Sequence, residues 1–510
     1  MEKKDKKILE HFNDLINKKN INKSEIFLAE NIDAIKLMKN KNKEYIRNRI
    51  IEKLKSDKEW VLKYKENLFL TSLLLHAISV EEGIESLIRA IELSSDVGDK
   101  IEVFWNIVRS NSLYKNKIKD PHYVNDAYMN IVEYVDRNIS KPLKVIKKGI
   151  EKFDLIIITN QLLNLSHAPT RETLEYARGF KELGYEVLIV VSNEMPHSPN
   201  LMMANPFIAN LDKNNSGRKL ISYQDIEFLA EFFVSRLNEH SLKNIIEYLT
   251  SLDPNCILSV GGYSFVAELM GRSAKLINLP CVTEFCASKF AQINFFWYGS
   301  EYIANEYKIR YKTTTQKIEC NLVPQYITPT RKIMLNAQQF NLDNAKILGV
   351  VVGNRLNDEI DSYFIDFLEF LCNHLEIQFL IIGSLSVVKK EAILKSLDIN
   401  VKFIDFYPNL IDIFDFCDLY INPMRVGGGT TAAYAMASGL PVYTINFGDV
   451  SKITYHDDCF SSYEEMKEIV GHVRKRDMNQ EKIKKMIKRF EHISDKKSFI
   501  TKIKEVSSIN

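Results

Sequence analysis

Residues 419–446 decide the fold and read LYINPMRVGGGTTAAYAMASGLPVYTIN. The stretch begins with a short apolar run, passes through three consecutive glycines and continues into an alanine-rich segment. Gly439 follows where a helix would end, and Pro441 leads into a second apolar run. The stretch therefore predicts a strand, a glycine-rich loop, a helix and a second strand, which is the repeating unit of a parallel α/β sheet.

The same alternation extends to both sides of this stretch. Further buried strands are predicted at residues 345–352, 378–382 and 401–404, with a helix at 361–375. An earlier series has predicted strands at 154–159, 186–191, 256–260 and 279–283, with helices at 176–183 and 223–250. Because parallel strands are joined by right-handed crossovers, the two series predict an α/β chain with two Rossmann-like domains that face a cleft.

The N-terminal part is different in kind. Apolar residues recur there at helical spacing, as in Ile84, Leu87 and Ile91, and glycine is nearly absent. We predict an all-helical accessory domain at residues 1–150, for oligomerisation or for docking a partner protein. Rossmann-like domains are expected at 151–335 and 336–480. Residues 481–510 are expected to form a basic helix with an apolar stripe, whose polar face would be either solvated or in peripheral contact with an anionic membrane or an acidic partner.

Composition excludes several classes of protein. The 510 residues include 68 Lys and Arg against 66 Asp and Glu, a net charge of +2, which argues against a general nucleic-acid binder. The seven cysteines include no CxxC pair, as expected in a reducing compartment. No apolar run reaches the length of a membrane span, and the N-terminus lacks the apolar stretch of a secretory signal. We therefore expect a cytoplasmic protein.

The glycine loop carries the strongest chemical signal. Gly427, Gly428 and Gly429 let backbone N–H groups approach an anion, and the start of the next helix adds its partial positive charge. Thr430 and Thr431 supply hydroxyl donors, and Arg425 supplies a fixed cation; together they predict a diphosphate site. A purely structural glycine loop is the alternative.

A second cation follows the strand at 345–352. Gly353 permits a tight exit from that strand, and Arg355 is expected near the same sheet edge as the glycine loop. Its predicted role is to contact the phosphates or the transferred group. The alternative is an arginine that pairs with Asp358 or Glu359.

Two loops of the earlier series carry weaker signals. His167 lies between a buried strand and a helix, where it would act as a general base or orient a substrate hydroxyl; a helix-capping or structural loop histidine is the alternative. Thr170 is expected to cap that helix. Gly261, Gly262 and Tyr263 follow another strand, where they would bind an acceptor or form a plain turn, and Glu284 ends a further predicted strand.

The sequence predicts no metal site. Cysteine and histidine spacings do not suit zinc, there is no HExxH or GxSxG motif, and no pair of aspartates follows a buried strand in a convincing context. We therefore expect no cofactor and no bound metal.

At these residues the chain resembles the GT-B glycosyltransferases, which hold a nucleotide-sugar between two Rossmann-like domains. The resemblance implies a donor domain at 336–480, an acceptor domain at 151–335, and a last helix that packs back toward the first Rossmann-like domain. Many retaining members carry a glutamate where this chain has Tyr434 and another where it has Val426. The paired threonines and the HAPT motif that contains His167 look more like O-GlcNAc-transferase relatives and bacterial protein glycosyltransferases, which also begin with a helical region.

This resemblance implies a role for each matching residue. His167 and Arg355 become candidate catalytic residues. The implied donor-binding residues are Gly353, Asn354, Arg425, Gly427, Gly428, Gly429, Thr430, Thr431 and Tyr434. Gly261, Gly262, Tyr263 and Glu284 fall on the acceptor side.

The implied activity is transfer of a hexose or N-acetylhexosamine from a nucleotide diphosphate, expected to be UDP, to a protein or glycan acceptor. Two alternatives remain open. A nucleotide-sugar epimerase shares the two-domain architecture and needs no acceptor. A non-catalytic GT-B-like subunit would support a partner enzyme, and the missing acidic residue at Tyr434 favours that alternative.

Overall fold

The computed structural model describes the whole chain except residues 1, 20, 57–63, 115–121, 140–151, 164, 166, 196–215, 234–236, 280, 282–287, 298–307, 312–316, 323–329, 471–474, 476–479 and 508–510. The chain divides into two compact units. The first contains Met1–Asn164, Gly184–Asn278 and Cys286–Gln292, and the second contains Leu165–Leu183, Leu279–Phe285 and Ile293–Asn510.

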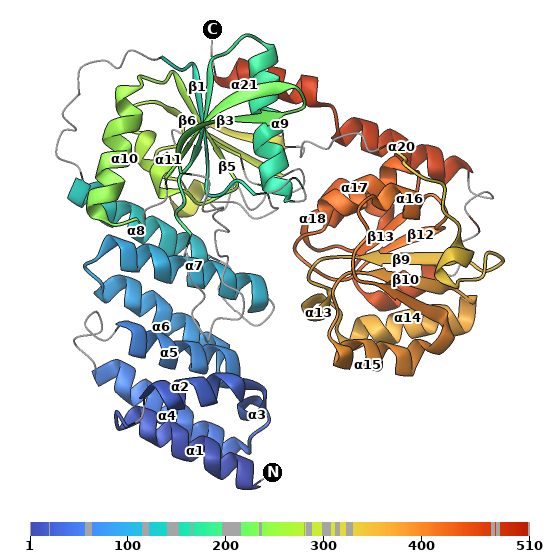
Figure 1. Cartoon of the computed structure of the whole chain (residues 1–510), viewed down its shortest axis with the longest axis horizontal. Helices are drawn as coiled ribbons and strands as arrows, with labels where there is room; N and C mark the ends of the chain where they lie inside the picture. The colour runs from blue at the N-terminus through green and yellow to red at the C-terminus, as the bar shows by residue number, and fades with distance from the viewer. Residues whose placement is uncertain are drawn as a thin grey trace. The chain divides into compact units, whose positions relative to one another are not determined.

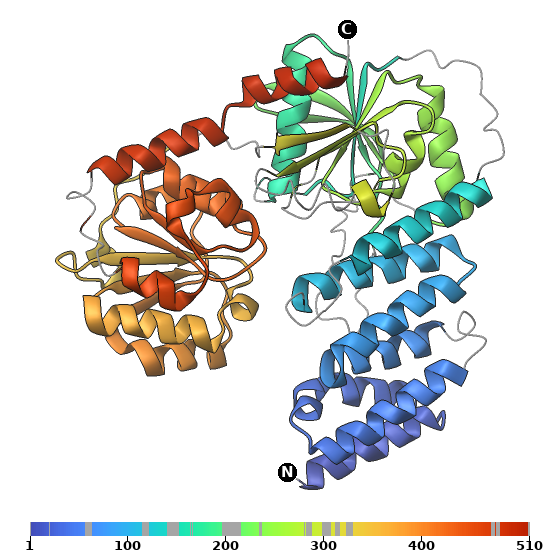
Figure 2. The ribbon, with the colours of Figure 1, turned by 180° about the vertical axis from the view of Figure 1, so that it is seen from behind.

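The N-terminal region is helical, as the sequence predicts. Its helices are α1 (Glu2–Ile16), α2 (Ile21–Glu30), α3 (Ile32–Lys36), α4 (Asn40–Ser56), α5 (Tyr64–Leu73), a π-helical turn (Leu74–Ile78), α6 (Val80–Leu93), α7 (Val97–Tyr114) and α8 (Tyr123–Ile139). Helix α6 shows why these segments are helical: the Ser79 side chain accepts from the Glu82 N–H at its start, and Ile84, Leu87 and Ile91 are buried along one face. Helices α5 to α8 follow one another in chain order in both ribbon views, next to the group formed by α1–α4 (Figure 1, Figure 2).

The first sheet has eight strands in the order β3-β4-β2-β1-β5-β6-β7-β8. Their bounds are β1 (Leu155–Thr159), β2 (Val187–Val191), β3 (Gly217–Tyr223), β4 (Ile226–Phe232), β5 (Cys256–Val260), β6 (Lys275–Leu279), β7 (Ile293–Trp297) and β8 (Lys317–Leu322). The helices of this region are α9 (Ala168–Glu182), α10 (Glu239–Ser251) and α11 (Phe265–Met270). Strand β1 is central and parallel to β2 and β5, and its five residues are all buried.

Two predictions for this region are wrong. The helix expected at 223–250 begins only at Glu239, because β3 and β4 form an antiparallel hairpin whose turn places Gln224 and Asp225 at φ 49° and 64°. The alternating pattern of β4, IEFLAEF, was the overlooked strand signal. The strand expected to begin at residue 279 instead ends there, since β6 is Lys275–Leu279.

The second sheet has six strands in the order β11-β10-β9-β12-β13-β14, and neighbouring strands are parallel throughout. The strands are β9 (Leu348–Val352), β10 (Gln378–Ile382), β11 (Val401–Ile404), β12 (Leu419–Asn422), β13 (Val442–Ile445) and β14 (Cys459–Phe460). The α-helices are α13 (Leu356–Glu359), α14 (Ser362–Leu375), α15 (Val387–Leu397), α16 (Leu410–Phe414), α17 (Gly429–Ala437), α18 (Gly448–Ile453) and α19 (Tyr463–Val470). Short 3₁₀ turns lie at Ala337–Phe340, Asp398–Asn400 and His456–Asp458.

The order in which the chain adds strands to the second sheet reverses at β9. From β9 the chain adds β10 and β11 on one side, and β12, β13 and β14 on the other. The carboxyl ends of β9 and β12 therefore lie side by side where the strand order reverses, which is where ligands bind in open α/β sheets. Gly353 follows β9, and the glycine loop follows β12.

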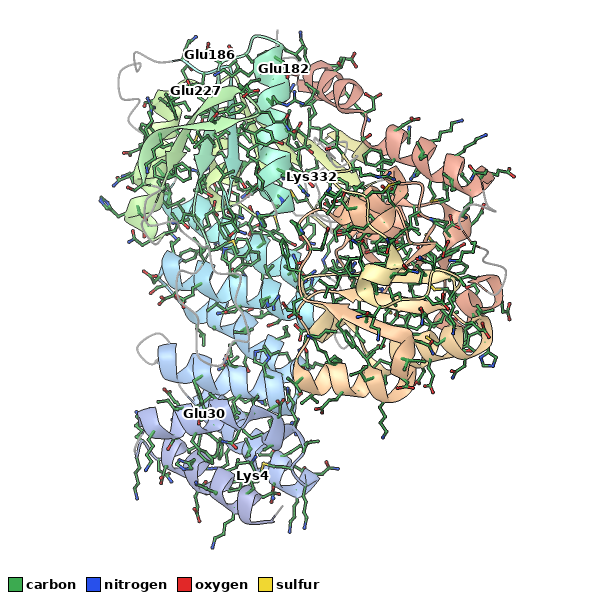
Figure 3. All side chains as sticks on the ribbon, turned by 45° about the vertical axis from the view of Figure 1, so that its right-hand side comes forward. Lys4, Glu30, Glu182, Glu186, Glu227 and Lys332 are labelled. Carbon is green, nitrogen blue, oxygen red and sulfur yellow. The ribbon has the colours of Figure 1, made fainter. Side chains whose placement is uncertain are left out.

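The basic C-terminal segment forms two helices, where the sequence predicts one: α20 (Gln480–Ile493) and α21 (Lys496–Ser507). Helix α21 packs closely against α9. A Cβ placed on Gly179 of α9 would lie only 2.9 Å from Ile500 Cγ1 of α21. Helix α9 ends at Glu182, labelled in Figure 3, whose carboxylate pairs with Arg178. Among the described helices, none is both long and apolar enough to cross a membrane.

Candidate active site

The site is built from the two loops that leave β9 and β12. Arg355 lies in the short connection from β9 to α13, and the glycine loop comprises the end of the connection from β12 to α17 (residues 423–428) and Gly429, the first residue of α17. A Cβ placed on Gly427 would lie 3.0 Å from Arg355 Nη2, so the guanidinium rests against the glycine loop. The structure therefore brings together the two strongest motifs of the sequence, which are more than seventy residues apart.

Arg355 is partly exposed to solvent and forms an ion pair with Glu359. Its side chain is 43% exposed, and its Nε lies 3.3 Å from Glu359 Oε1. The pairing that we considered as the structural alternative is thus present. It engages only the Nε side of the group, and Nη2 is the atom that lies nearest Gly427.

Arg425 is directed inward. Its side chain is 4% exposed, and its guanidinium donates to Asn422 Oδ1 (2.8 Å), Glu359 Oε2 (3.0 Å), the Val352 carbonyl (2.8 Å) and the Tyr420 hydroxyl (2.9 Å). These bonds use four of the five N–H groups of an arginine. Burial opposes the charge, but the interactions with Tyr420 and Glu359 outweigh it, and the pKa of Arg425 is raised. This geometry makes Arg425 a support of the loop; its direct contact with a donor stays a prediction.

Glycines surround the Arg425 side chain. Gly428 has φ 104°, and a Cβ there would lie 2.6 Å from Arg425 Nη2; a Cβ on Gly353 would lie 2.2 Å from Nη1. The Arg425 carbonyl leaves equally little room at Gly448, where a Cβ would lie 2.1 Å from it. The glycines are therefore needed to accommodate a buried arginine.

Helix α17 begins directly at the glycine loop. Gly428 is its N-cap residue and provides no side-chain cap, so the first N–H groups of the helix have no cap from that residue. Gly429 is buried at the first turn, while Thr430 and Thr431 are partly exposed. Together with Arg355, this helix start has the positive potential and the donors that a diphosphate requires.

The other predicted donor residues lie around this site. Asn354 is exposed beside Arg355. Tyr434 is partly buried in α17, one turn beyond the paired threonines, and the Arg171 guanidinium carbon lies 5.7 Å from its ring centroid. Burial raises the pKa of the Tyr434 hydroxyl, so the phenol is neutral at pH 7.

His167 lies at the start of α9, as the residue that precedes its first turn. Its side chain does not cap the helix; its Nδ1 lies 2.9 Å from Thr170 Oγ1. Thr170 itself lies within the first turn, so the prediction that it caps α9 is wrong. Burial and the nearby Arg171 lower the pKa of His167 to about 4, and the imidazole is therefore neutral at pH 7. A neutral imidazole accepts a proton or a hydrogen bond from a hydroxyl.

The predicted acceptor-side loop is engaged by the helical region. Gly261 and Gly262 have φ 109° and 106°, as a tight turn after β5 requires. The Tyr263 hydroxyl donates to Asn125 Oδ1 of α8 (2.8 Å), and the Tyr128 hydroxyl donates to the Ser264 carbonyl (2.9 Å). These contacts give the loop a structural role, and its contact with an acceptor stays a prediction. Glu284 lies outside the described residues.

Two buried contacts were not foreseen from the sequence. Glu359 was considered as a partner of Arg355, but its second ion pair, with Arg425, was not predicted. Glu194 is buried and accepts from the Ser264 hydroxyl and the Phe265 N–H, both at 2.6 Å. Its position after β2 gave no hint of this partner, which depends on tertiary packing. In the described part of the chain, no group of three His, Cys, Asp or Glu side chains could hold a metal ion.

Comparisons with known proteins agree with this geometry. Residues 348–475 match the family model described as "Glycosyl transferases group 1". No curated protein matches the chain. Among solved structures, the Thermobaculum terrenum O-GlcNAc transferase is similar over 91% of this chain and 86% of its own, with 12% identity and a TM-score of 0.56.

Two further structures are similar over a shorter part of the chain. The sucrose-phosphate synthase of Thermosynechococcus elongatus is 11% identical over 69% of this chain and 98% of its own, with a TM-score of 0.47. A pneumococcal O-GlcNAc transferase solved with UDP and GlcNAc is 11% identical over 70% and 99%, with a TM-score of 0.44. The chain has the GT-B fold, and its residues 348–475 form a group 1 glycosyltransferase domain.

Proposed function

We propose that this protein transfers a hexose or an N-acetylhexosamine from a UDP-linked sugar to a protein or glycan acceptor. The observation that carries the proposal is the position of Arg355 against Gly427, beside the start of α17. A group that binds there meets a guanidinium and a helix N-terminus, as the departing diphosphate of a nucleotide-sugar requires. The group 1 family match supports glycosyl transfer over other diphosphate chemistry.

The proposed mechanism uses charges that the protein itself supplies. As the bond from the sugar to the diphosphate breaks, negative charge grows on the phosphate oxygens, and Arg355 with the α17 N–H groups stabilises it. The sugar carbon gains oxocarbenium character, as in other reactions at this carbon. His167, neutral at pH 7, would accept a hydrogen bond or the proton of the acceptor hydroxyl. We propose that donor binding needs no metal.

Calorimetric titration without added metal tests the donor site. Wild-type protein should bind UDP and at least one UDP-sugar, and Arg355→Ala and Thr431→Ala should each weaken UDP binding about tenfold, the loss of one charge-assisted contact. Arg331→Ala is the matched control, because Arg331 is an exposed arginine that pairs with Asp415, at the opposite end of β12. EDTA should leave the affinity unchanged. Equal UDP affinity in wild type and Arg355→Ala would remove Arg355 from the donor site.

The acceptor is best sought through the helical region. Removing residues 1–150 would uncover the buried Tyr263 and Phe265, which pack with Tyr128 and Phe104 at ring centroid distances near 5 Å. A truncated protein would therefore confuse loss of docking with loss of folding. A surface change is cleaner: Ile88, Glu92 and Tyr123 line one hollow between α6 and α8.

Glu92→Lys tests whether that hollow receives a protein acceptor. If it does, the variant should lower transfer to a protein acceptor while leaving UDP affinity and hydrolysis of the UDP-sugar unchanged. A reduction in hydrolysis as well would point to a general defect. Unchanged transfer to every acceptor protein would argue against docking at this hollow and favour oligomerisation or a glycan acceptor.

A further inference from the structure

Glu359 contacts two arginines, one buried and one exposed. One oxygen, Oε2, accepts from Arg425 Nη1 at 3.0 Å, and the other, Oε1, lies 3.3 Å from Arg355 Nε. The Glu359 side chain is 12% exposed, the Arg425 side chain 4% and the Arg355 side chain 43%. A single carboxylate therefore joins a buried cation to one that reaches solvent.

The buried partner fixes the carboxylate in place. Arg425 also donates to the Val352 carbonyl at the end of β9 and to Asn422 at the end of β12, so it is held by both strands of the switch point. A Cβ on Gly428 or Gly353 would overlap its guanidinium, which shows how tightly the loops close around it. The position of Glu359 is thus set by the sheet and not by α13 alone.

This attachment distinguishes the Arg355–Glu359 pair from an ordinary surface pair. An exposed pair four residues apart holds its partners only loosely. Here Glu359 is also bonded to the buried Arg425, and it contacts Arg355 through Nε while Nη2 lies against Gly427. The rotational freedom of the arginine is reduced before any ligand arrives, which lowers the entropic cost of binding.

We infer that Glu359 is a positioning residue that holds Arg355 against the glycine loop for contact with a diphosphate. The inference rests on the proposed donor site. It predicts a change in phosphate affinity opposite to the one expected from charge alone. Removing a negative charge beside a phosphate site should by itself strengthen phosphate binding, because a repulsion is lost. If Glu359 acts by positioning Arg355, its removal should weaken binding instead.

A double-mutant cycle measured by UDP calorimetry tests the inference. Glu359→Gln should weaken UDP binding about fivefold to tenfold in the wild-type background, the effect expected from losing one preorganised side chain. In the Arg355→Ala background the same change should alter the affinity less than about twofold, because the group through which Glu359 acts is absent. Equal weakening in both backgrounds, or tighter binding in Glu359→Gln, would overturn the inference.

Asp358→Asn provides the matched control. Asp358 is an exposed carboxylate on the same short helix, so the change removes the same charge without touching Arg425. It should leave UDP affinity unchanged or slightly higher, and a loss equal to that of Glu359→Gln would refute a specific role for Glu359. Should Glu359→Gln fail to fold, Glu359→Asp keeps a carboxylate while withdrawing it from Arg355, and it should also weaken binding.

Inorganic pyrophosphate separates this inference from the proposed function. If wild-type protein binds pyrophosphate but no UDP compound, the proposed donor is wrong, and the same four-protein cycle with pyrophosphate tests the positioning role. If wild-type protein binds neither probe, both the donor site and the role of Glu359 are refuted.

Discussion

The packing of Arg425 inside the glycine loop predicts opposite behaviour for two neighbouring glycines. Gly428 has φ 104°, and a Cβ there would lie 2.6–2.8 Å from three atoms of the Arg425 guanidinium. Gly427 carries no such backbone constraint, and its Cβ would meet only the end of the flexible Arg355 side chain, at 3.0 Å. Gly428→Ala should therefore destabilise the domain, and Gly427→Ala should disturb the site.

The magnitude follows from two contributions. Forcing a residue with a Cβ into left-handed backbone costs about 1–2 kcal/mol. The guanidinium cannot move aside without lengthening at least one charge-assisted hydrogen bond, each of which contributes about 1.5–3 kcal/mol. The sum is about 2.5–5 kcal/mol, or a fall of roughly 10 °C in the Tm of a domain of this size. Gly427→Ala should stay within about 0.5 kcal/mol of wild type.

Differential scanning calorimetry at one pH and protein concentration measures both variants, and UDP titration follows on each. The expected pattern is a large loss of stability for Gly428→Ala alone, and for Gly427→Ala a UDP affinity about fivefold lower, equivalent to about 1 kcal/mol. Equal Tm values for the two variants would refute the reasoning, because they would show that the Arg425 guanidinium moves aside for a methyl group without loss of stability.

Three further predictions concern titration and packing. If His167 acts while neutral, kcat/KM should fall as the pH drops through about 4, the folded-state pKa, and His167→Gln should abolish that limb; a limb at pH 6.5 would contradict the burial argument. Burial raises the pKa of Glu172 from 4.5 to about 8 in the folded protein. The folded protein is therefore most stable below pH 4.5, where Glu172 is protonated, and this stability is lost as the pH rises through 8. Glu172→Gln should match wild type in urea unfolding at pH 5 and exceed it by roughly 4 kcal/mol at pH 9, and a constant difference would be inconsistent with this titration. Tyr128→Phe removes the buried bond to the Ser264 carbonyl and should cost about 1–1.5 kcal/mol by chemical denaturation, whereas an unchanged free energy of unfolding would show that this bond contributes nothing.

Local pattern was sufficient for the strands buried on both faces. Runs such as those of β1, β2, β5, β9 and β10 are short, apolar and rich in β-branched residues, and a chain segment of that kind has no stable place except inside a covered parallel sheet. The hairpin of β3 and β4 escaped prediction because half of its residues face solvent, and their mixture of charged and apolar side chains also fits a helix. Strands were therefore hardest to predict where only one face of the sheet is buried.

The glycine loop shows the same division for the site. Its glycines, threonines and arginines were identifiable from the sequence, because the chemistry of anion binding requires those residue types. Which of the two arginines is exposed was not identifiable. Arg355 and Arg425 each follow a strand of the same sheet, and only the structure shows that one is exposed and the other buried.

What the sequence by itself determined is therefore the helical N-terminal region, the two series of buried parallel strands and the residue types at the switch point, since these depend on periodicity and on local backbone requirements. Only the tertiary structure decided the partners: Glu359 between the two arginines, Tyr263 against α8, and His167 with Thr170. The physical reason is that a buried polar group must find a hydrogen-bond partner, and for Arg425 and Tyr263 that partner comes from a part of the chain distant in sequence.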